Sequence, residues 1–182
     1  MTAPAPRGAG SFFDRIMDST PRSRQPRAMS DDERYMREAL ALADAAAAIG
    51  EVPIGSIVVR DGVIVGRGHN RREIDQDPTA HAELIAIRDA ATRLGTWRLS
   101  GCRLFVSLEP CAMCAGAMVL ARIDTCVFGC TDPKGGFLGT LGDLSSWHGL
   151  NHRFEVVRGV LAEEASNRLV SFFRDLRASK RV

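Results

Sequence analysis

From Ser30 onward, the sequence alternates between runs with the composition of strands and segments with the periodicity of helices. The strand-like runs are short, rich in Val, Ile, Phe and Thr, and occupy residues 54–60, 63–67, 103–108, 125–130 and 154–158. Apolar residues at helical spacing predict four helices, over residues 31–49, 79–94, 111–121 and 161–177. Because helices alternate with strands, we expect an α/β fold in which helices cover both faces of a mixed sheet.

Local signals mark where several of these elements begin and end. Ser30 and Glu33 form a capping box, in which each side chain accepts a hydrogen bond from an otherwise unpaired N–H at the start of the first helix. Gly50 ends that helix, and Asp61-Gly62 is a strong signal for a two-residue hairpin between the first two strands. The Gly-rich stretch over residues 131–150 is too long to be a simple connector.

The chain has 182 residues, the size of one ordinary domain with a tail. Residues 1–30 contain four prolines, several Ser, Thr and Gly residues and little apolar periodicity. We therefore expect residues 1–29 to be a disordered extension and residues 30–182 to be the folded domain. Met29 directly precedes the capping box, so we also expect either that translation starts at Met29 or that the tail is dispensable.

Composition and charge narrow the functional classes. No run of about 18 apolar residues is present, and the first thirty residues lack the apolar stretch of a secretory signal, so we expect a cytoplasmic protein without a membrane span. Five cysteines are an odd number for a disulfide framework and favour metal ligation or buried thiols. Net charges of +3 over residues 1–30 and +4 over residues 165–182 flank an acidic body of −5. The basic ends are either phosphate-binding or merely solvated.

Two fragments carry residues that can bind a metal ion: His81-Ala82-Glu83 and Pro110-Cys111-Ala112-Met113-Cys114. Cys111 and Cys114 are three positions apart, so in the first turn of a helix both sulfur atoms project from one face. With the His81 imidazole they make a Cys₂His set, which is an acceptable zinc site with a fourth position left for water. Such an open position is typical of catalytic zinc, and we expect Glu83 to lie beside the ion rather than on it.

The other three cysteines leave an alternative open. Cys102, Cys126 and Cys130 lie within or beside predicted strands, where a cysteine is most simply a small buried apolar residue. If Cys126 or Cys130 instead completed the tetrahedron, the ion would be structural, and the chain would be a non-catalytic zinc-stabilised module that binds RNA.

The pattern H-x-E followed by P-C-x-x-C is the signature of zinc-dependent nucleobase deaminases. From about Ser30 to Lys180 the chain resembles one family of them, the bacterial tRNA-specific adenosine deaminases. Besides the two fragments above, the matching stretches are Glu51-Val52-Pro53-Ile54-Gly55, Asn70, Ala115-Gly116-Ala117, Val127-Phe128-Gly129, Asn151-His152-Arg153 and Phe172-Phe173-Arg174. The resemblance implies a cytidine deaminase-like three-layer α-β-α sandwich with a central five-stranded mixed sheet, and makes residues 30–182 a zinc-dependent deaminase domain.

The resemblance also implies a reaction, the hydrolytic deamination of the wobble adenosine to inosine in a tRNA anticodon loop. The implied cofactor is one Zn²⁺ per subunit, with His81, Cys111 and Cys114 as its ligands. Hydrolysis at neutral pH needs a nucleophile, and zinc provides a hydroxide by lowering the pKa of its water to about 7. Glu83 would take the proton from that water and pass it first to the ring and then to the departing amine.

The residues expected to meet the RNA come from the same resemblance. Asn70 would hydrogen-bond the flipped base and its ribose, although asparagine also commonly occupies turns. Ala82 would contact the same nucleotide, while Asp132 and Lys134 would meet its neighbours or serve only as solubilising loop residues. The implied partners are a tRNA anticodon stem-loop and a second copy of the chain in a homodimer.

The last predicted helix allows an inference from spacing. One helical stripe, which we assign to the core, is formed by Ala165, Leu169, Phe172 and Leu176. Phe173 points about 100° away from that stripe, on the side of Val170 and Arg177. We therefore expect Phe173 to stack on an anticodon-loop base, with Arg174 and Arg177 near phosphates. The alternative is that Phe173 packs against the core or a partner chain.

Two other functions fit parts of the sequence. A deaminase of free guanine or cytosine needs the zinc site but no RNA surface, and the basic, aromatic C-terminal helix argues against it. Free-cytidine deaminases typically have Cys where this chain has His81, so they fit less well. The zinc-stabilised RNA-binding module is the rival from another class, and it needs a fourth protein ligand.

Overall fold

The computed structural model describes residues 29–179 and contains five strands and four helices within them. In chain order the elements are α1 (Asp31–Ala48), β1 (Gly55–Arg60), β2 (Val63–His69), α2 (Ala82–Leu94), β3 (Cys102–Leu108), α3 (Ala112–Ala121), β4 (Thr125–Cys130), β5 (Glu155–Arg158) and α4 (Ala162–Ser179). These elements are the ones that the sequence predicts. The expected extension over residues 1–29 lies, apart from Met29, outside the described residues. Within residues 29–179, no helix is long and apolar enough to cross a bilayer.

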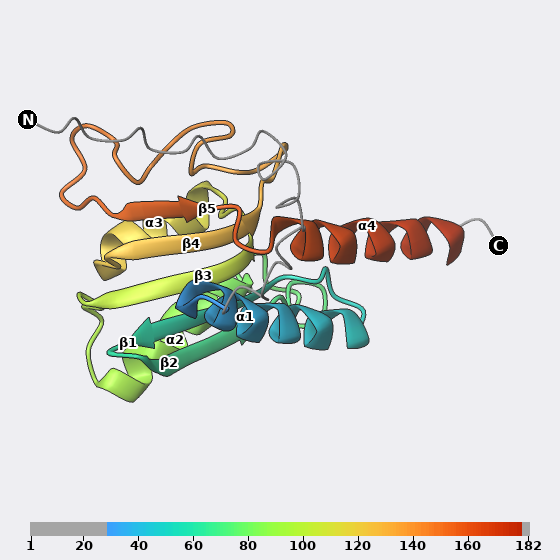
Figure 1. Cartoon of the computed structure of the whole chain (residues 1–182), viewed down its shortest axis with the longest axis horizontal. Coiled ribbons are helices and arrows are strands. Elements are labelled where there is room, and N and C mark those ends of the chain that lie inside the picture. Colours follow the sequence, from blue (N-terminus) through green and yellow to red (C-terminus); the bar gives the residue numbers. More distant parts are fainter. Residues whose placement is uncertain (1–28, 180–182) are drawn as a thin grey trace, which may run out of the picture.

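The five strands form one mixed sheet in the order β2-β1-β3-β4-β5 (Figure 1). β1 pairs antiparallel with both β2 and β3, whereas β3 with β4 and β4 with β5 are parallel pairs. Asp61 and Gly62 join β1 to β2 with φ angles of 49° and 78°, as a type I′ turn requires, so the hairpin prediction is confirmed. In the parallel half, Leu108 at the end of β3 is paired with Cys130 at the end of β4. The two strands therefore end side by side.

Helices cover both faces of this sheet, and alternate strand residues face opposite layers. The layer of α1 and α4 packs on Ile57, Phe105 and Val127. The layer of α2 and α3 packs on Val58, Leu104, Val106, Cys126 and Phe128. Figure 1 shows the two layers on either side of the sheet. The predicted three-layer α-β-α sandwich with a five-stranded mixed sheet is therefore confirmed.

Two glycines let α2 lie close against β2. A Cβ atom at Gly66 would overlap the Ala86 carbonyl oxygen, and one at Gly68 would overlap the Ala82 carbonyl oxygen at the start of the helix. Only a residue without a side chain fits at these positions. The first turn of α2, which carries Glu83, is thereby held against the end of β2.

α4 is attached to α1 and extends past the sheet. Arg168 of α4 forms a two-pronged ion pair with Asp44 of α1, at 2.7 and 3.0 Å. The predicted core stripe of α4 is only partly correct, because Ala165 is buried but Leu176 is 38% exposed. Figure 1 shows the reason: the C-terminal half of α4 continues beyond the edge of the sheet and so does not pack on it.

Candidate active site

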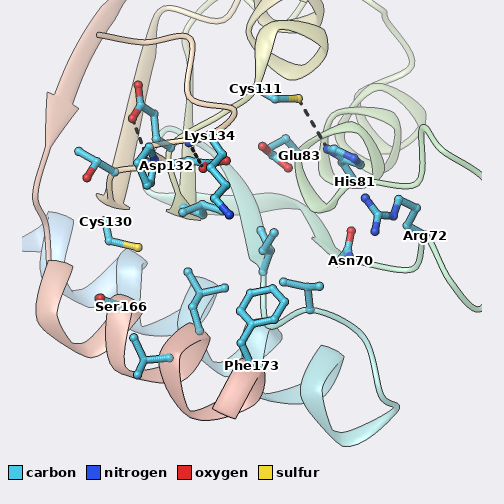
Figure 2. Close-up of a pocket in the computed structure, with 18 of the residues that line it drawn as sticks. Asn70, Arg72, His81, Glu83, Cys111, Cys130, Asp132, Lys134, Ser166 and Phe173 are labelled. Atoms are coloured by element: carbon cyan, nitrogen blue, oxygen red, sulfur yellow. Dashed lines mark hydrogen bonds between the residues drawn. The ribbon is translucent and has the colours of Figure 1, made fainter. Parts of the chain in front are cut away.

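A pocket of about 740 Å³ opens where β3 and β4 end and α2 and α3 begin. Leu108 and Cys130, the paired residues at the two strand ends, lie in its wall. α4 covers one side through Phe173, and His81 and Glu83 lie on the opposite side (Figure 2). The volume is within the range of small-molecule and nucleotide sites. The fold therefore gathers residues of α2, β3, β4 and α4, and of the loops between elements, around one cavity.

His81, Cys111 and Cys114 present three ligand atoms that lie within 4.8 Å of one another. Nδ1 of His81 is 3.7 Å from Sγ of Cys111 and 3.6 Å from Sγ of Cys114. A tetrahedral zinc ion with Zn–S bonds of about 2.3 Å and Zn–N bonds of about 2.1 Å requires an S···N separation of about 3.6 Å. The donor set and its spacing both fit zinc, so these three side chains form a zinc-binding site.

Both ligand-bearing segments are helix N-termini. His81 is the N-cap residue of α2 and Cys111 is that of α3, and neither side chain caps its own helix by a hydrogen bond. Cys114 is buried in the first turn of α3, with its sulfur near the same imidazole as that of Cys111. The predicted convergence of the two sulfurs is thus confirmed. The positive ends of the two helices favour thiolates here.

The surroundings of the two cysteines shift their pKa values in opposite directions. Hydrogen bonds with Cys114 and His81 lower the pKa of Cys111 to about 4, although burial acts in the opposite direction. The hydrogen bond to Cys111 and burial together raise the pKa of Cys114 well above its usual value. Cys111 and Cys114 would both hold a metal ion as thiolates, which is the form of cysteine that binds metals.

Glu83 lies beside the three ligands without belonging to them. It is 4% exposed, lies in the first turn of α2 and lines the pocket. The group of metal-binding atoms found within residues 29–179 does not include its carboxylate. Burial raises the pKa of Glu83, and negative charge on Cys111 acts in the same direction. A buried carboxylate with a raised pKa next to a zinc site is suited to take up and release protons.

The cysteines that could complete the metal shell lie elsewhere. Cys126 is fully buried in β4, on the face that packs against α2 and α3. Cys130 is half-buried in the pocket wall, and Figure 2 shows it across the cavity from Cys111. Across the described part of the chain, the His81 cluster is the one group of three or more potential ligands within reach of a single ion. The structural-zinc alternative therefore lacks its fourth protein ligand within residues 29–179.

Residues 29–130 match the family described as the cytidine and deoxycytidylate deaminase zinc-binding region. The tRNA-specific adenosine deaminase of Bacillus subtilis is 52% identical over 154 residues, which are 85% of this chain and 96% of that protein. The chain belongs to the tRNA-specific adenosine deaminase family. A relative of the same name from Haemophilus influenzae is 46% identical over 83% of this chain and 88% of its own length. A solved structure from a study of A-to-I editing by tRNA:A34 deaminases is 40% identical, with a TM-score of 0.72, over 75% of this chain and 99% of that chain.

The deaminase pocket contains most of the side chains predicted to bind substrate. Four of them line it: Asn70, Asp132, Lys134 and Phe173 (Figure 2). Ala82 is fully buried and is not part of the lining, because the first turn of α2 packs against Gly68. Arg174 is also outside the lining and pairs with Asp175 at 3.0 Å, because it lies on another face of α4 than Phe173. Arg177, which is also expected near phosphates, does line the pocket.

Glu109 is a buried carboxylate that sequence reasoning missed. It is 2% exposed and accepts the backbone N–H groups of Asp132, Leu138 and Thr140. Burial alone would raise the pKa of Glu109, but these hydrogen bonds and that from the Thr140 hydroxyl lower it below its usual value. Glu109 thereby anchors residues 132–140, the first half of the Gly-rich stretch, beside the pocket.

Glu51 and Arg72 were missed as well. Glu51 is fully buried and accepts a hydrogen bond from the side chain of Asn70, 19 positions away. Arg72 lines the pocket next to Asn70 (Figure 2). The only available signal for Glu51 was its place in a stretch that matches the family, and spacing alone does not connect it to the site.

Proposed function

We propose that this adenosine deaminase converts the wobble adenosine of a tRNA anticodon loop to inosine, with consumption of one water and release of ammonia. The observation that carries the proposal is the position of Glu83, a buried carboxylate outside the ligand cluster but in the same pocket. Family membership supports the reaction class. We further propose that the deaminase domain spans residues 30–182 and that the enzyme acts in the cytoplasm, where its tRNA substrate is found.

The residues present support a proton-transfer mechanism. When bound to His81, Cys111 and Cys114, zinc lowers the pKa of a water molecule to about 7 and so supplies a nucleophile at neutral pH. Glu83 accepts the proton that this water loses and delivers it to N1 of adenine as the C6–O bond forms. Glu83 then moves the proton of the new C6 hydroxyl to N6, the C6–N6 bond breaks and ammonia leaves. Adenosine and water become inosine and ammonia, and Glu83 ends in the protonation state in which it began.

The walls of the pocket support a single-stranded RNA substrate. Asn70 faces the cavity near His81, where it can hydrogen-bond the target nucleotide (Figure 2). Phe173 is 40% exposed on the opposite wall, where an unstacked base of the anticodon loop can stack. Lys134 and Arg177 add positive charge beside it, which suits the phosphates of neighbouring nucleotides. Asp132 remains a candidate contact to those neighbours.

We also propose that α3 forms the interface of a homodimer, the assembly that the family resemblance implies. The helix contains no charged side chain, and Leu120 is 71% exposed while Met113, two turns earlier, is 36% exposed. An exposed apolar helix face of this kind is typical of an interface between subunits. Light scattering at working concentration should give twice the mass of the chain, and a monomer would contradict this proposal.

The function is tested with purified zinc-loaded protein and five substrates: an anticodon stem-loop with adenosine at the wobble position, and free adenine, adenosine, guanine and cytosine. We expect inosine in the stem-loop and no turnover of the free compounds. Turnover of guanine or cytosine without inosine in the RNA would instead identify a free-base deaminase. Spectroscopy of the protein with Co²⁺ in place of zinc should show two thiolates bound to the metal, whereas three thiolates would identify the non-catalytic zinc-stabilised module.

A further inference from the structure

Glu51 is a fully buried carboxylate in the connection between α1 and β1. Its Oε2 atom accepts a hydrogen bond from Nδ2 of Asn70 at 2.9 Å, and its Oε1 atom accepts one from the backbone N–H of Ile74 at 2.8 Å. Both donors belong to the segment that follows β2. Because a buried carboxylate is costly unless it is hydrogen-bonded, the two bonds tie this segment firmly to Glu51.

This arrangement fixes the orientation of the Asn70 side chain. Each oxygen of Glu51 accepts one hydrogen bond, so the NH₂ group of Asn70 faces Glu51 and its Oδ1 faces away from it. The backbone of Asn70 is fixed too, because its N–H donates to the Ile54 carbonyl oxygen at 2.9 Å. Figure 2 shows the Asn70 oxygen on the side of His81 and Glu83. Asn70 therefore presents an acceptor to the pocket.

The chemistry of adenosine limits what that acceptor can bind. The ring nitrogens N3 and N7 are themselves acceptors, N1 receives a proton from Glu83 in the proposed reaction, and the N6 amine is the leaving group. Within an RNA chain the 3′ and 5′ oxygens of the target nucleotide are esterified. The 2′-hydroxyl is then the one strong donor that remains for Oδ1 of Asn70.

We propose that Glu51 is a positioning residue, which holds the amide of Asn70 so that Oδ1 accepts a hydrogen bond from the 2′-hydroxyl of the target adenosine. This inference rests on the proposed function and adds the group that orients the ribose contact. Glu51 does not touch the substrate and acts through Asn70.

The Glu51→Gln variant tests this role because it should reverse the orientation of the Asn70 side-chain amide. The N–H of Ile74 is a fixed donor, so the glutamine must turn its carbonyl oxygen to Ile74 and its NH₂ group to Asn70. Asn70 must then turn its own oxygen to the glutamine, and its NH₂ group faces the pocket. The variant keeps the shape of the side chain and converts the group presented to the ribose from an acceptor into a donor.

The readout is the ratio of kcat/KM on two stem-loops, with a 2′-hydroxyl or a 2′-fluoro group at the target adenosine. Fluorine can accept weakly but cannot donate, so the parent enzyme should prefer the hydroxyl about tenfold. Glu51→Gln should reduce that preference to within about twofold, as should Asn70→Ala. In the double variant with both Glu51→Gln and Asn70→Ala, the preference should equal that of Asn70→Ala alone, because Glu51 acts only through Asn70.

Asp89→Asn is the matched control, since it also converts a hydrogen-bonded carboxylate to an amide but lies on α2 outside the pocket lining. It should keep the tenfold preference. The inference is overturned if Glu51→Gln retains the parent preference, or if it slows both stem-loops equally. If the parent enzyme deaminates neither stem-loop, the proposed function fails instead.

A measurement on the parent protein keeps the inference testable if the glutamine variant does not fold. In ¹⁵N spectra, one Nδ2 proton of Asn70 should exchange with solvent about tenfold or more slowly than those of the exposed Asn167. Equal exchange at the two side chains would show that Glu51 does not hold the amide.

Discussion

Nδ1 of His81 and Sγ of Cys114 lie 3.6 Å apart, although 33 positions separate the two residues. The separation is that of two ligands of one tetrahedral zinc ion. It arises because α2 and α3 begin at the same edge of the sheet, and because Gly68 allows the start of α2 to approach β2 closely. The deaminase fold therefore prepares the metal site through backbone packing rather than through the ligand side chains alone.

Replacing Glu83 with alanine should leave zinc bound and abolish most of the activity. The carboxylate is not among the clustered metal-binding atoms, but it is the proton carrier of the proposed mechanism. We expect kcat to fall by about 10² to 10⁴ with one zinc per subunit retained, measured by single-turnover assay and metal analysis. Near-normal turnover would remove Glu83 from the mechanism.

Replacing Cys114 with serine should lower the affinity for zinc by more than about 100-fold. Loss of a residue that only hydrogen-bonds a metal ligand costs up to about 100-fold, and Cys114 is itself a ligand. Cys130→Ser is the matched control, because Cys130 lies across the pocket from the cluster. Competition with a chelator measures both affinities. A large loss of zinc affinity in Cys130→Ser would show that the ligand set is wrong.

The parts of this structure that could be predicted depend on short-range signals. The Ser30 capping box, the Asp61-Gly62 turn and the three-residue spacing of Cys111 and Cys114 each bring together groups that are close in the sequence. Their geometry follows from the local helix or turn. Helices and strands with a strong apolar periodicity could be predicted for the same reason.

The parts that could not be predicted depend on long-range contacts with the backbone. Glu109 accepts hydrogen bonds from the backbone N–H groups of Leu138 and Thr140. Almost every residue has a backbone N–H group, so the sequence does not show which ones Glu109 will bind. The position of Arg174 outside the pocket lining could not be predicted for a related reason. Spacing gives the angle between residues on a helix, but not how much of α4 the rest of the protein covers.

Replacing Glu109 with glutamine should loosen the loop over residues 131–150 without unfolding the sheet. The amide has one acceptor oxygen where the carboxylate has two, so at least one buried donor loses its partner, at a cost of about 1 to 3 kcal/mol. Leu138 and Thr140 both donate their N–H groups to Oε1, where the glutamine oxygen remains, so the N–H of Asp132 loses its acceptor Oε2. Hydrogen exchange at the Asp132 amide should therefore accelerate, while exchange at Phe105 in β3 stays slow. Unchanged exchange at the Asp132 amide would contradict the assigned role.

Phe173→Ala and Arg177→Ala should each weaken binding of the anticodon stem-loop, whereas Arg174→Ala should not. Both Phe173 and Arg177 line the pocket, and Arg174 points elsewhere. Loss of one stacking contact costs about 1 to 3 kcal/mol, and loss of one phosphate contact reduces the salt dependence of binding. Titrations at several salt concentrations measure both effects. Parent-like affinity of Phe173→Ala would mean that the ring serves packing only.

Asp89 provides a prediction for the pH dependence of stability. Burial alone would raise the pKa of Asp89, but hydrogen bonds from Arg93 and from the Arg67 backbone N–H lower it below its usual value of 3.8. A lowered pKa in the folded state stabilises the protein above pH 4 and ceases to do so as the pH falls through the folded-state value. The free energy of unfolding of Asp89→Asn should be about 1 kcal/mol lower at pH 7 and should converge with that of the parent below pH 4. A difference independent of pH would contradict the prediction.

The most direct measurement is the nucleoside at the wobble position of tRNA from cells depleted of this protein. If the chain is the wobble adenosine deaminase, sequencing should read adenosine where tRNA from undepleted cells reads inosine, and restored expression of the parent chain, but not of Glu83→Ala, should bring inosine back. Inosine that persists at full level after depletion would contradict the proposed function.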